Sequence, residues 1–458
     1  MFVGRNSELR KLENIYQSGK FECVIVHGRW RVGKTSLIRE FINEKNAVYY
    51  SAQVTAPIES AVNLASSILT FSSIENTTEE EITNFDDAFR LLYDAADSER
   101  LILVLDDFQN LVSSCKQISQ LICKHIDKHF KSSKLMLIII GSSQPLMMEQ
   151  TLDFESPFHG RRTAVIELQP FSFFEIRTFY KEFSPFDIAV IFGVTGGVPR
   201  YMGLMDAQLP IEENIMRAVF EPASPLLEEP INILRREIRE PAHYNAVLRA
   251  IAEGKSKNSE IATAVDLETS ACAGYLKNLM AMGIVGKYTP VTEKVGKRTV
   301  YDISDHMFRF WYRFVPVNMS FIQAGLTAKI WRDVSNAIPK YMSHVFEDIC
   351  RQWLISRNES ERLPIKFVEI GRWWGYDPVW KMDVELPIVA YAENDSAIFG
   401  ECVWSDAPAH TDALVSLAER SRLFRFSNRY LYLFSRSGFS DDCADAAQRI
   451  GANLVMFE

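Results

Sequence analysis

The residues with the most evident chemical potential form the stretch G-R-W-R-V-G-K-T-S at positions 28–36. Its spacing, G-x-x-x-x-G-K-[ST], is that of a phosphate-binding loop. Gly28 and Gly33 allow a tight turn whose backbone N–H groups surround phosphate oxygens. Lys34 is expected to reach the β- and γ-phosphates, and the hydroxyl of Thr35 to ligate Mg²⁺. The residues expected around the nucleotide are Gly28, Arg29, Trp30, Arg31, Val32, Gly33, Lys34, Thr35 and Ser36.

The flanks of this loop have the pattern that the motif requires. An apolar, β-rich run at 21–27 precedes it, and residues 36–42 are apolar at helical spacing. A helix that begins at Lys34 or Thr35 would direct its positive N-terminal end at the same anion. The alternative, a chance glycine turn before a helix, is disfavoured because both flanks fit.

A second group of reactive side chains follows the apolar run L-I-L-V-L at 101–105. Such a run is typical of a strand buried on both faces, and its carboxyl end is where ligands bind in open α/β sheets. Asp106 is therefore placed to hold Mg²⁺, and Asp107 to polarise the attacking water. After the next apolar strand, 135–140, Ser142 or Ser143 would either sense the γ-phosphate or cap a helix.

Two further segments have open interpretations. Residues 2–17, which include Val3, Gly4 and Arg5, predict a loop and helix that either close over the adenine or only pack. Further strands are predicted at 47–51 and 163–168. The arginines before the last strand would either contact phosphate, in cis or from a neighbouring subunit, or be solvated. These are Arg161 and Arg162.

Composition excludes several classes of protein. The 458 residues are 47% hydrophobic and 24% charged, with a net charge of −9, so no global field draws the chain to DNA or to an acidic membrane. The seven cysteines contain no C-x-x-C pair, which argues against a disulfide framework or a zinc site. No signal-peptide pattern and no apolar run of membrane-spanning length are present, so we expect a cytoplasmic protein.

The ordered set F-V-G-R-x-x-E-L, G-x-x-x-x-G-K-T, L-D-D-F-Q, G-S-S, G-R-R and G-G-V-P-R resembles the archaeal-type ATPase family of the AAA+/STAND branch. The resemblance implies an α/β P-loop ATPase fold with strand order 5-1-4-3-2, ATP and Mg²⁺ as ligands, and a helical lid that senses the nucleotide. It also implies that Pro199 lies near the adenine. Many relatives have Asp-Glu where this chain has Asp106-Asp107, and the shorter second acid argues for slow turnover.

Four domains are predicted: an ATPase core at 1–175, a helical lid at 176–238, a winged helix at 239–304, and a linker helix with an α/β domain at 305–458. In the winged helix, basic residues gather at the tip of the wing, but Lys277 is the only basic residue of the expected recognition helix. Either DNA contact or a packing or autoinhibitory role is compatible with this pattern. The basic wing-tip residues are Lys294, Lys297 and Arg298, beside Gly296.

The last domain is similar to PD-(D/E)xK nucleases, which implies Glu347, Asp383 and Glu401 as metal-binding acids. Val403 stands where such enzymes have a lysine, so we interpret the site as degenerate and inactive. The sequence as a whole predicts a slow, Mg²⁺-dependent ATPase that acts as a switch, with a nucleotide-dependent homo-oligomer among its expected states. The alternatives are an ATP-gated enzyme that binds or cleaves DNA, and a module that holds its nucleotide permanently.

Overall fold

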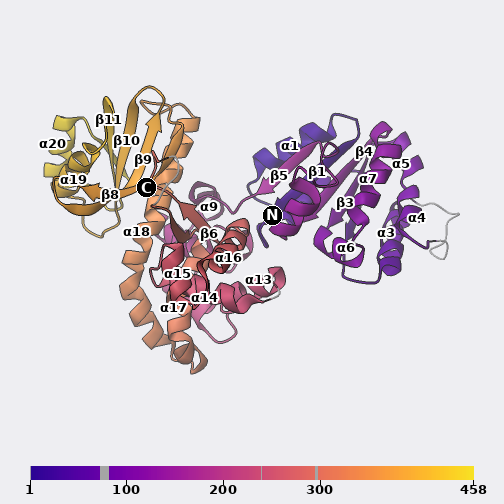
Figure 1. The fold of residues 1–458 in the computed structure, drawn as a ribbon, viewed down its shortest axis with the longest axis horizontal. Coiled ribbons are helices and arrows are strands. Elements are labelled where there is room, and N and C mark those ends of the chain that lie inside the picture. The colour runs from indigo at the N-terminus through magenta and orange to yellow at the C-terminus, as the bar shows by residue number, and fades with distance from the viewer. Residues whose placement is uncertain (1, 73–81, 239, 294–297, 458) are drawn as a thin grey trace. The chain divides into compact units, whose positions relative to one another are not determined.

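A computed structural model describes residues 2–72, 82–238, 240–293 and 298–457 of the chain (Figure 1). The chain forms two compact units, Met1–Pro170 with Val198–Arg200, and Phe171–Gly197 with Tyr201–Glu458. Three residues of the predicted wing tip, Lys294, Gly296 and Lys297, lie outside the described residues.

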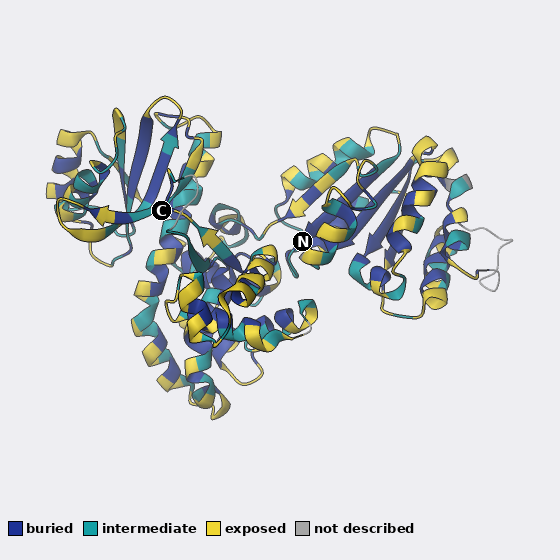
Figure 2. Ribbon diagram, viewed as in Figure 1, coloured by how far each residue is buried: buried dark blue, intermediate teal, exposed yellow. Residues whose placement is uncertain are grey.

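The first unit is built on a parallel sheet. Its strands are β1 (Glu22–Gly28), β2 (Ala47–Ser51), β3 (Leu101–Asp106), β4 (Leu135–Gly141) and β5 (Ala164–Leu168). Their order is β2-β3-β4-β1-β5, which is the predicted 5-1-4-3-2 read from the opposite edge, so the prediction is confirmed. Both β3 and β4 are buried along their whole length, as the apolar runs in the sequence require (Figure 2).

Helices cover the two faces of this sheet. They are α1 (Asn6–Tyr16), α2 (Lys34–Ile42), α3 (Pro57–Ser72), α4 (Phe85–Arg90), α5 (Tyr93–Ser98), α6 (Phe108–Ser114), α7 (Ile118–Lys128) and α8 (Gln144–Met147). Alternate side chains of β1 enter different cores, because successive Cβ atoms of a strand point to opposite faces. Val24 packs in one core with Leu37 of α2, whereas Ile25 packs in the other with Phe108 of α6.

The second unit begins with helices, as predicted. They are α9 (Phe173–Phe179), α10 (Pro185–Thr195), α11 (Pro199–Met202), α12 (Ile211–Ile215) and α13 (Glu229–Glu237), with a π-helical turn at Met216–Phe220. The sequence pattern suggests one helix over 171–186, but the structure contains two. Ser172 forms a capping box with Glu175 at the start of α9, and Ser184 caps α10, whose first residue is Pro185.

Residues 241–303 form three helices and an antiparallel strand pair, close to the predicted positions. They are α14 (Pro241–Ala252), α15 (Asn258–Ala264), α16 (Thr269–Ala281), β6 (Val285–Tyr288) and β7 (Val300–Ile303). The linker helix α17 (His306–Gln323) follows, and then α18 (Thr327–Glu359). None of the described helices is both long enough and apolar enough to cross a membrane.

The chain ends in a mixed sheet of order β12-β11-β10-β9-β8 (Figure 1). Its elements are β8 (Glu369–Asp377), β9 (Met382–Ala392), β10 (Ser396–Val403), α19 (Thr411–Ser421), β11 (Asn428–Ser435), α20 (Asp441–Ile450) and β12 (Asn453–Met456). Leu417 of α19 packs with Phe399 of β10, and Leu433 of β11 packs with Cys443 of α20. Trp353 of α18 packs against Tyr432 and Phe434 of β11, on the other side of the sheet.

The first prediction concerns the close approach of β1 and β5. A Cβ atom at Gly28, where φ is +152°, would lie 2.3 Å from the carbonyl oxygen of Leu168. We expect Gly28→Ala to lower the free energy of unfolding of the first unit by about 2 kcal/mol or more, because backbone atoms cannot yield as side chains do. Urea denaturation followed by circular dichroism measures this change.

The matched control is Gly160→Ala, at a position with φ of +73° and open space around the new Cβ. In this variant the free energy of unfolding should fall only by the cost of placing alanine in a left-handed backbone conformation, about 1 kcal/mol. Equal losses in the two variants would contradict the steric argument.

Candidate functional site

The glycine loop joins the carboxyl end of β1 to the first turn of α2. The helix begins at Lys34, and Gly33 precedes it with φ of +93°. Arg31 also has a positive φ, +67°, so the loop turns sharply twice within three residues. Val32 is fully buried in the core of the first unit, which leaves its backbone as the part available to a ligand. This geometry directs successive N–H groups toward the start of α2, as an anion site requires.

The ammonium group of Lys34 is held within the loop. The side chain is 5% exposed, and Nζ donates hydrogen bonds of 2.8 Å to the carbonyl oxygens of Gly28 and Arg29. A cation in this position adds to the positive end of α2, so the loop presents charge and backbone donors to the same point. Ser36 lies two positions further along the helix and is exposed.

The carboxylate of Asp106 is the meeting point of several elements. Thr35 Oγ1 of α2 donates to Asp106 Oδ2 over 2.7 Å, and Tyr49 OH of β2 donates to the same oxygen. The other oxygen accepts the N–H of Asp107 over 2.8 Å. The structure thus brings together Thr35 and Asp106, the two residues predicted as Mg²⁺ ligands. One carboxylate and one hydroxyl fit Mg²⁺, which takes few protein ligands and completes its shell with water and phosphate.

Asp107 immediately precedes α6 and has a strained backbone conformation. Its φ and ψ are 54° and 46°, in the left-handed region, and Gln109 Nε2 donates to its Oδ1 over 3.0 Å. Burial raises the pKa of Asp107, and the charge of Asp106 raises it further. A raised pKa brings a carboxylate closer to the range in which it can accept a proton from water.

Gln109 and Tyr49 are site residues that the sequence argument did not identify. Besides holding Asp107, Gln109 accepts the backbone N–H of Ser142 over 3.2 Å, and so links the first turn of α6 to the residue just after β4. Its position in L-D-D-F-Q was a usable signal, because an amide two residues after the acid can reach back to it. Nothing in the sequence near Tyr49 indicated its contact with Asp106, because that contact arises only from the pairing of β2 with β3.

The N-terminal segment is anchored beside the loop. Arg5 is 7% exposed and donates to the carbonyl oxygens of Gln169 over 2.6 Å and Val32 over 3.4 Å. Val3 and Gly4 precede it and are half-buried. Pro199 Cγ lies 3.8 Å from the position that a Cβ of Gly33 would take. The structure therefore places the Val3–Gly4–Arg5 segment and Pro199 near the phosphate loop. Ser143 is half-buried and comes two residues after Gly141, the register partner of His27 at the end of β1.

Arg161 and Arg162 are not brought to the loop. Arg161 pairs with Asp127 over 2.6 Å, and Arg162 donates to the carbonyl oxygen of Thr151 over 2.7 Å. Both precede β5, whose neighbour Thr163 bonds to Cys23 at the start of β1. Five residues of β1 separate that end of the sheet from the loop, about 17 Å at strand spacing. In a parallel sheet the residues that precede β5 lie at the opposite end from the phosphate loop. The prediction that these arginines contact phosphate in cis is therefore wrong.

The loop between β6 and β7 is packed against the C-terminal sheet. Val291 is 3% exposed and donates its N–H to the carbonyl oxygen of Arg372 in β8 over 2.9 Å. Arg298 donates to the carbonyl oxygen of Trp374 over 2.6 Å and also pairs with Glu293. The described basic residue of the predicted wing tip is thus engaged in packing.

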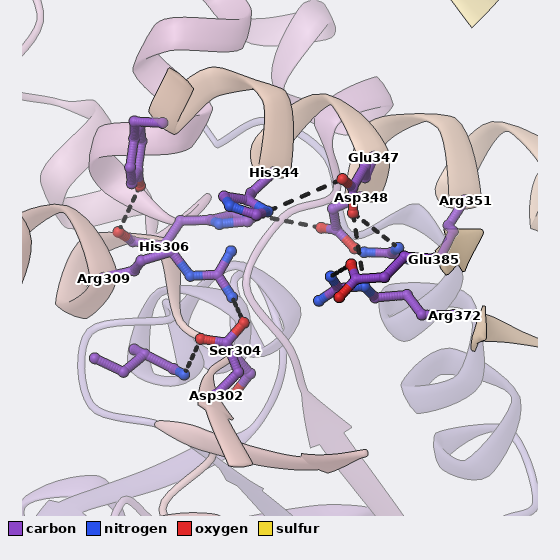
Figure 3. Close-up of polar contacts among 12 residues, drawn as sticks. Asp302, Ser304, His306, Arg309, His344, Glu347, Asp348, Arg351, Arg372 and Glu385 are labelled. Carbon is purple, nitrogen blue, oxygen red and sulfur yellow. Dashed lines mark hydrogen bonds and ion pairs between the residues drawn. The ribbon is translucent and has the colours of Figure 1, made fainter. Parts of the chain in front are cut away.

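The three acids predicted for a degenerate nuclease site do not form one site. Glu347 of α18 lies between Arg351 and Arg372, at 3.9 and 3.8 Å, in the charged network of Figure 3. Asp383 is exposed on β9, and Glu401 pairs with Arg420 of α19. Within the described ranges, no group of three or more His, Cys, Asp or Glu side chains is arranged to hold a metal ion.

The alternation of side chains along β10 explains this correction. The Cys402 thiol interacts with Cys350 of α18, so the preceding residue, Glu401, faces α19 on the other side of the sheet. Burial raises the pKa of Glu347, although the charges of Arg372 and Arg351 oppose that shift. Glu347 is therefore a member of an ion network that joins α18 to β8 and β9.

Comparisons with known proteins fit this geometry. Residues 2–205 match a family described as an ATPase domain predominantly from Archaea, and residues 311–415 match one described as archaeal and bacterial proteins of unknown function. The uncharacterized protein MJECL04 of Methanocaldococcus jannaschii is 31% identical over 408 residues, which cover 89% of this chain and 88% of that protein.

A similar fold occurs among solved structures. The Walker-type ATPase PABY2304 of Pyrococcus abyssi is 21% identical, with a TM-score of 0.52 over 68% of this chain and 96% of that chain. At this identity the likeness shows the fold alone.

The position of Arg161 generates a second prediction. Because its guanidinium pairs with Asp127 at the edge opposite the loop, Arg161→Gln should leave the rate of ATP turnover within about twofold of the wild type. The rate is measured by phosphate release at high dilution, where copies of the chain are apart. A loss of more than about tenfold at that dilution would restore the role in cis.

Proposed function

The chain belongs to the archaeal ATPase family, and from that premise we propose that it binds ATP with Mg²⁺ and hydrolyses it slowly, as a nucleotide-driven switch of the AAA+/STAND type. The observation that carries the proposal is the 2.7 Å contact between Thr35 of the phosphate loop and Asp106 of β3. It brings a hydroxyl and a carboxylate to the point where the metal of a bound nucleotide is needed.

Each side chain of the loop has a distinct task in binding. Lys34 Nζ would exchange the carbonyl oxygens of Gly28 and Arg29 for phosphate oxygens, which are stronger acceptors for an ammonium group. Thr35 and Asp106 would hold Mg²⁺, which would neutralise charge on the β- and γ-phosphates. Arg5 fixes the N-terminal segment to the loop, so that this segment and Pro199 can flank the rest of the nucleotide.

Hydrolysis depends on Asp107. Its carboxylate would accept a proton from the attacking water, and Gln109 holds that carboxylate by one of its two oxygens. An Asp side chain is one methylene shorter than Glu, so it positions water less closely and the expected turnover is slow. Slow turnover lets the bound state persist, which suits a switch better than a motor.

For the rest of the chain, we propose a lid at 176–238, a winged helix at 239–304 and a linker with an α/β domain at 305–458. The packing of Val291 on β8 supports a structural or autoinhibitory role for the wing rather than contact with DNA. The exposed part of α16 includes Lys277, its only basic residue, and one lysine is too few to recognise a DNA sequence through base edges.

Nucleotide-dependent self-association is tested by mass measurement in solution with ADP and with ATP.

The third prediction separates the two acids. Asp107→Asn should keep ATP affinity within about threefold but lower turnover by about a hundredfold, because an amide cannot accept the proton. Asp106→Asn should instead weaken binding of the Mg²⁺ complex, because it removes a metal ligand. Lys34→Ala serves as the control that loses tight binding.

Calorimetry with Mg²⁺–ATP, and phosphate release under single-turnover conditions, measure the two properties. The same defect in both aspartate variants would contradict the division of roles. Nucleotide that copurifies with the wild type and does not exchange would favour a module that holds it permanently.

The fourth prediction is the pH dependence of kcat/KM, which reports groups of the free enzyme. The pKa of Asp107 is raised, and the base must be deprotonated to act. The rate constant should therefore fall as pH falls through this raised pKa, at a higher pH than an ordinary Asp would give. A profile that stays flat down to the usual pKa of Asp, about 3.9, would contradict Asp107 as the base.

A further inference from the structure

A large groove lies on the C-terminal sheet, within the second unit. It has a volume of about 820 Å³ and lies between α9, α18 and the strands β11 and β12. Helix α18 packs on β9 and β10, so the same face of the sheet beyond it, over β11 and the edge strand β12, is only partly covered. The groove fills that uncovered part.

The charge of the groove is the reverse of that of the whole chain. The protein has 59 acidic and 50 basic residues, yet the described residues that line the groove include no Asp or Glu. They include three arginines, Arg177 of α9, Arg357 of α18 and Arg362 just after it. Among the described residues, none of these three guanidinium groups forms an ion pair. Three cations at one recess, with no acid among its described lining residues, favour an anionic ligand that itself carries several charges.

The wall along α18 combines this charge with aromatic rings. Lining residues from Phe346 to Ser360 recur at helical spacing on one side of α18. Arg357 Cζ lies 4.7 Å from the centroid of the Trp353 ring, which in turn packs against Phe434 at 5.6 Å. The guanidinium is thus supported by a layer of rings, and a supported guanidinium is a flat surface on which a nucleobase can stack.

We propose that this groove binds single-stranded nucleic acid, with phosphates at the three arginines and a base stacked on the layer formed by Arg357 and Trp353. The lining stretch from Phe346 of α18 to Ser360, the residue just after the helix, is about 21 Å long at 1.5 Å per residue, enough for a few nucleotides. Ser356, Ser360 and Asn453 supply neutral hydrogen-bonding groups along the way.

Two observations favour a nucleic acid over an acidic peptide. The guanidinium fork matches phosphate in a bidentate manner, and the stacked arrangement of Arg357 on Trp353 suits a planar base rather than an aliphatic side chain. The site is independent of the phosphate loop and does not rest on ATP hydrolysis. It also differs from the proposed winged helix, because none of the described residues that line the groove comes from 241–303.

The experiment uses the full-length protein and fluorescence anisotropy of short labelled oligothymidylate and oligouridylate, at low and at physiological salt. We expect binding that weakens with salt. Arg357→Gln and Arg362→Gln should each lower affinity by about five- to tenfold and reduce the salt slope by about 0.7, the value for one phosphate contact of a single strand. The relative affinities of the two probes show whether DNA or RNA is preferred.

The matched control is Arg332→Gln, which removes the same charge from an exposed position of α18 outside the groove. It should leave affinity and salt slope unchanged. Thermal melting must show that all variants are folded, and Lys34→Ala should bind the oligonucleotides like the wild type, which separates this site from the ATP site.

A direct map comes from photocrosslinking with a bromouracil-containing oligonucleotide, followed by peptide mass spectrometry. Crosslinks should fall on Trp353, Tyr432 or their neighbours. Absence of binding at low salt, crosslinks that fall only on α16, or an equal loss in Arg332→Gln would each overturn the proposal. Displacement of the labelled oligonucleotide by polyglutamate at a charge concentration at least tenfold lower than unlabelled oligonucleotide requires would assign the groove to an acidic protein instead.

Discussion

A buried carboxylate must be paired, and the way Asp106 meets this requirement organises the first unit. At 4% exposure it accepts hydrogen bonds from Thr35 of α2, from Tyr49 of β2 and from the N–H of Asp107. Burial raises the pKa of the Tyr49 hydroxyl, as does the Asp106 carboxylate, so the hydroxyl remains a donor. The phosphate loop, the strand β2 and the start of α6 are thereby tied to one pair of oxygens. A metal ion bound to Asp106 would replace some of these hydrogen-bond donors. Nucleotide binding would therefore change the contacts of all three elements.

In the second unit, the loop between β6 and β7 is not exposed to solvent along its whole length, because part of it packs against the C-terminal sheet. The loop between β6 and β7 gives Val291 to the core of the C-terminal sheet and Arg298 to the backbone of β8. These contacts protect the edge of β8, which would otherwise present unpaired backbone groups to other chains. The opposite edge of the same sheet carries the arginine-lined groove. One edge is thus covered by the chain itself, and the face beside the other is left open and positively charged.

The spacing of acidic residues along the C-terminal domain did not predict which side of the sheet each acid faces. Glu401 lies near the end of the strand β10, where a metal-binding acid is expected, but its side chain faces α19 and pairs with Arg420. Glu347 faces the other side and is held by Arg351 and Arg372. Opposite faces of a sheet cannot contribute to one metal site, whatever the order of the residues along the chain.

Local patterns in the sequence placed the start of α2 at Lys34 or Thr35 and assigned Thr35 and Asp106 to one metal ion, whereas the order of the first sheet came from the family resemblance. Apolar runs fix buried strands, and a parallel sheet gathers their carboxyl ends at one edge. Only the tertiary structure decided the roles of residues whose partners are distant in the chain. Tyr49 reaches Asp106 through strand pairing, Arg161 is held at the far edge by Asp127, and Trp353 of α18 packs on Phe434 of β11. No local pattern encodes such contacts, since they depend on which faces and edges the folded chain places side by side.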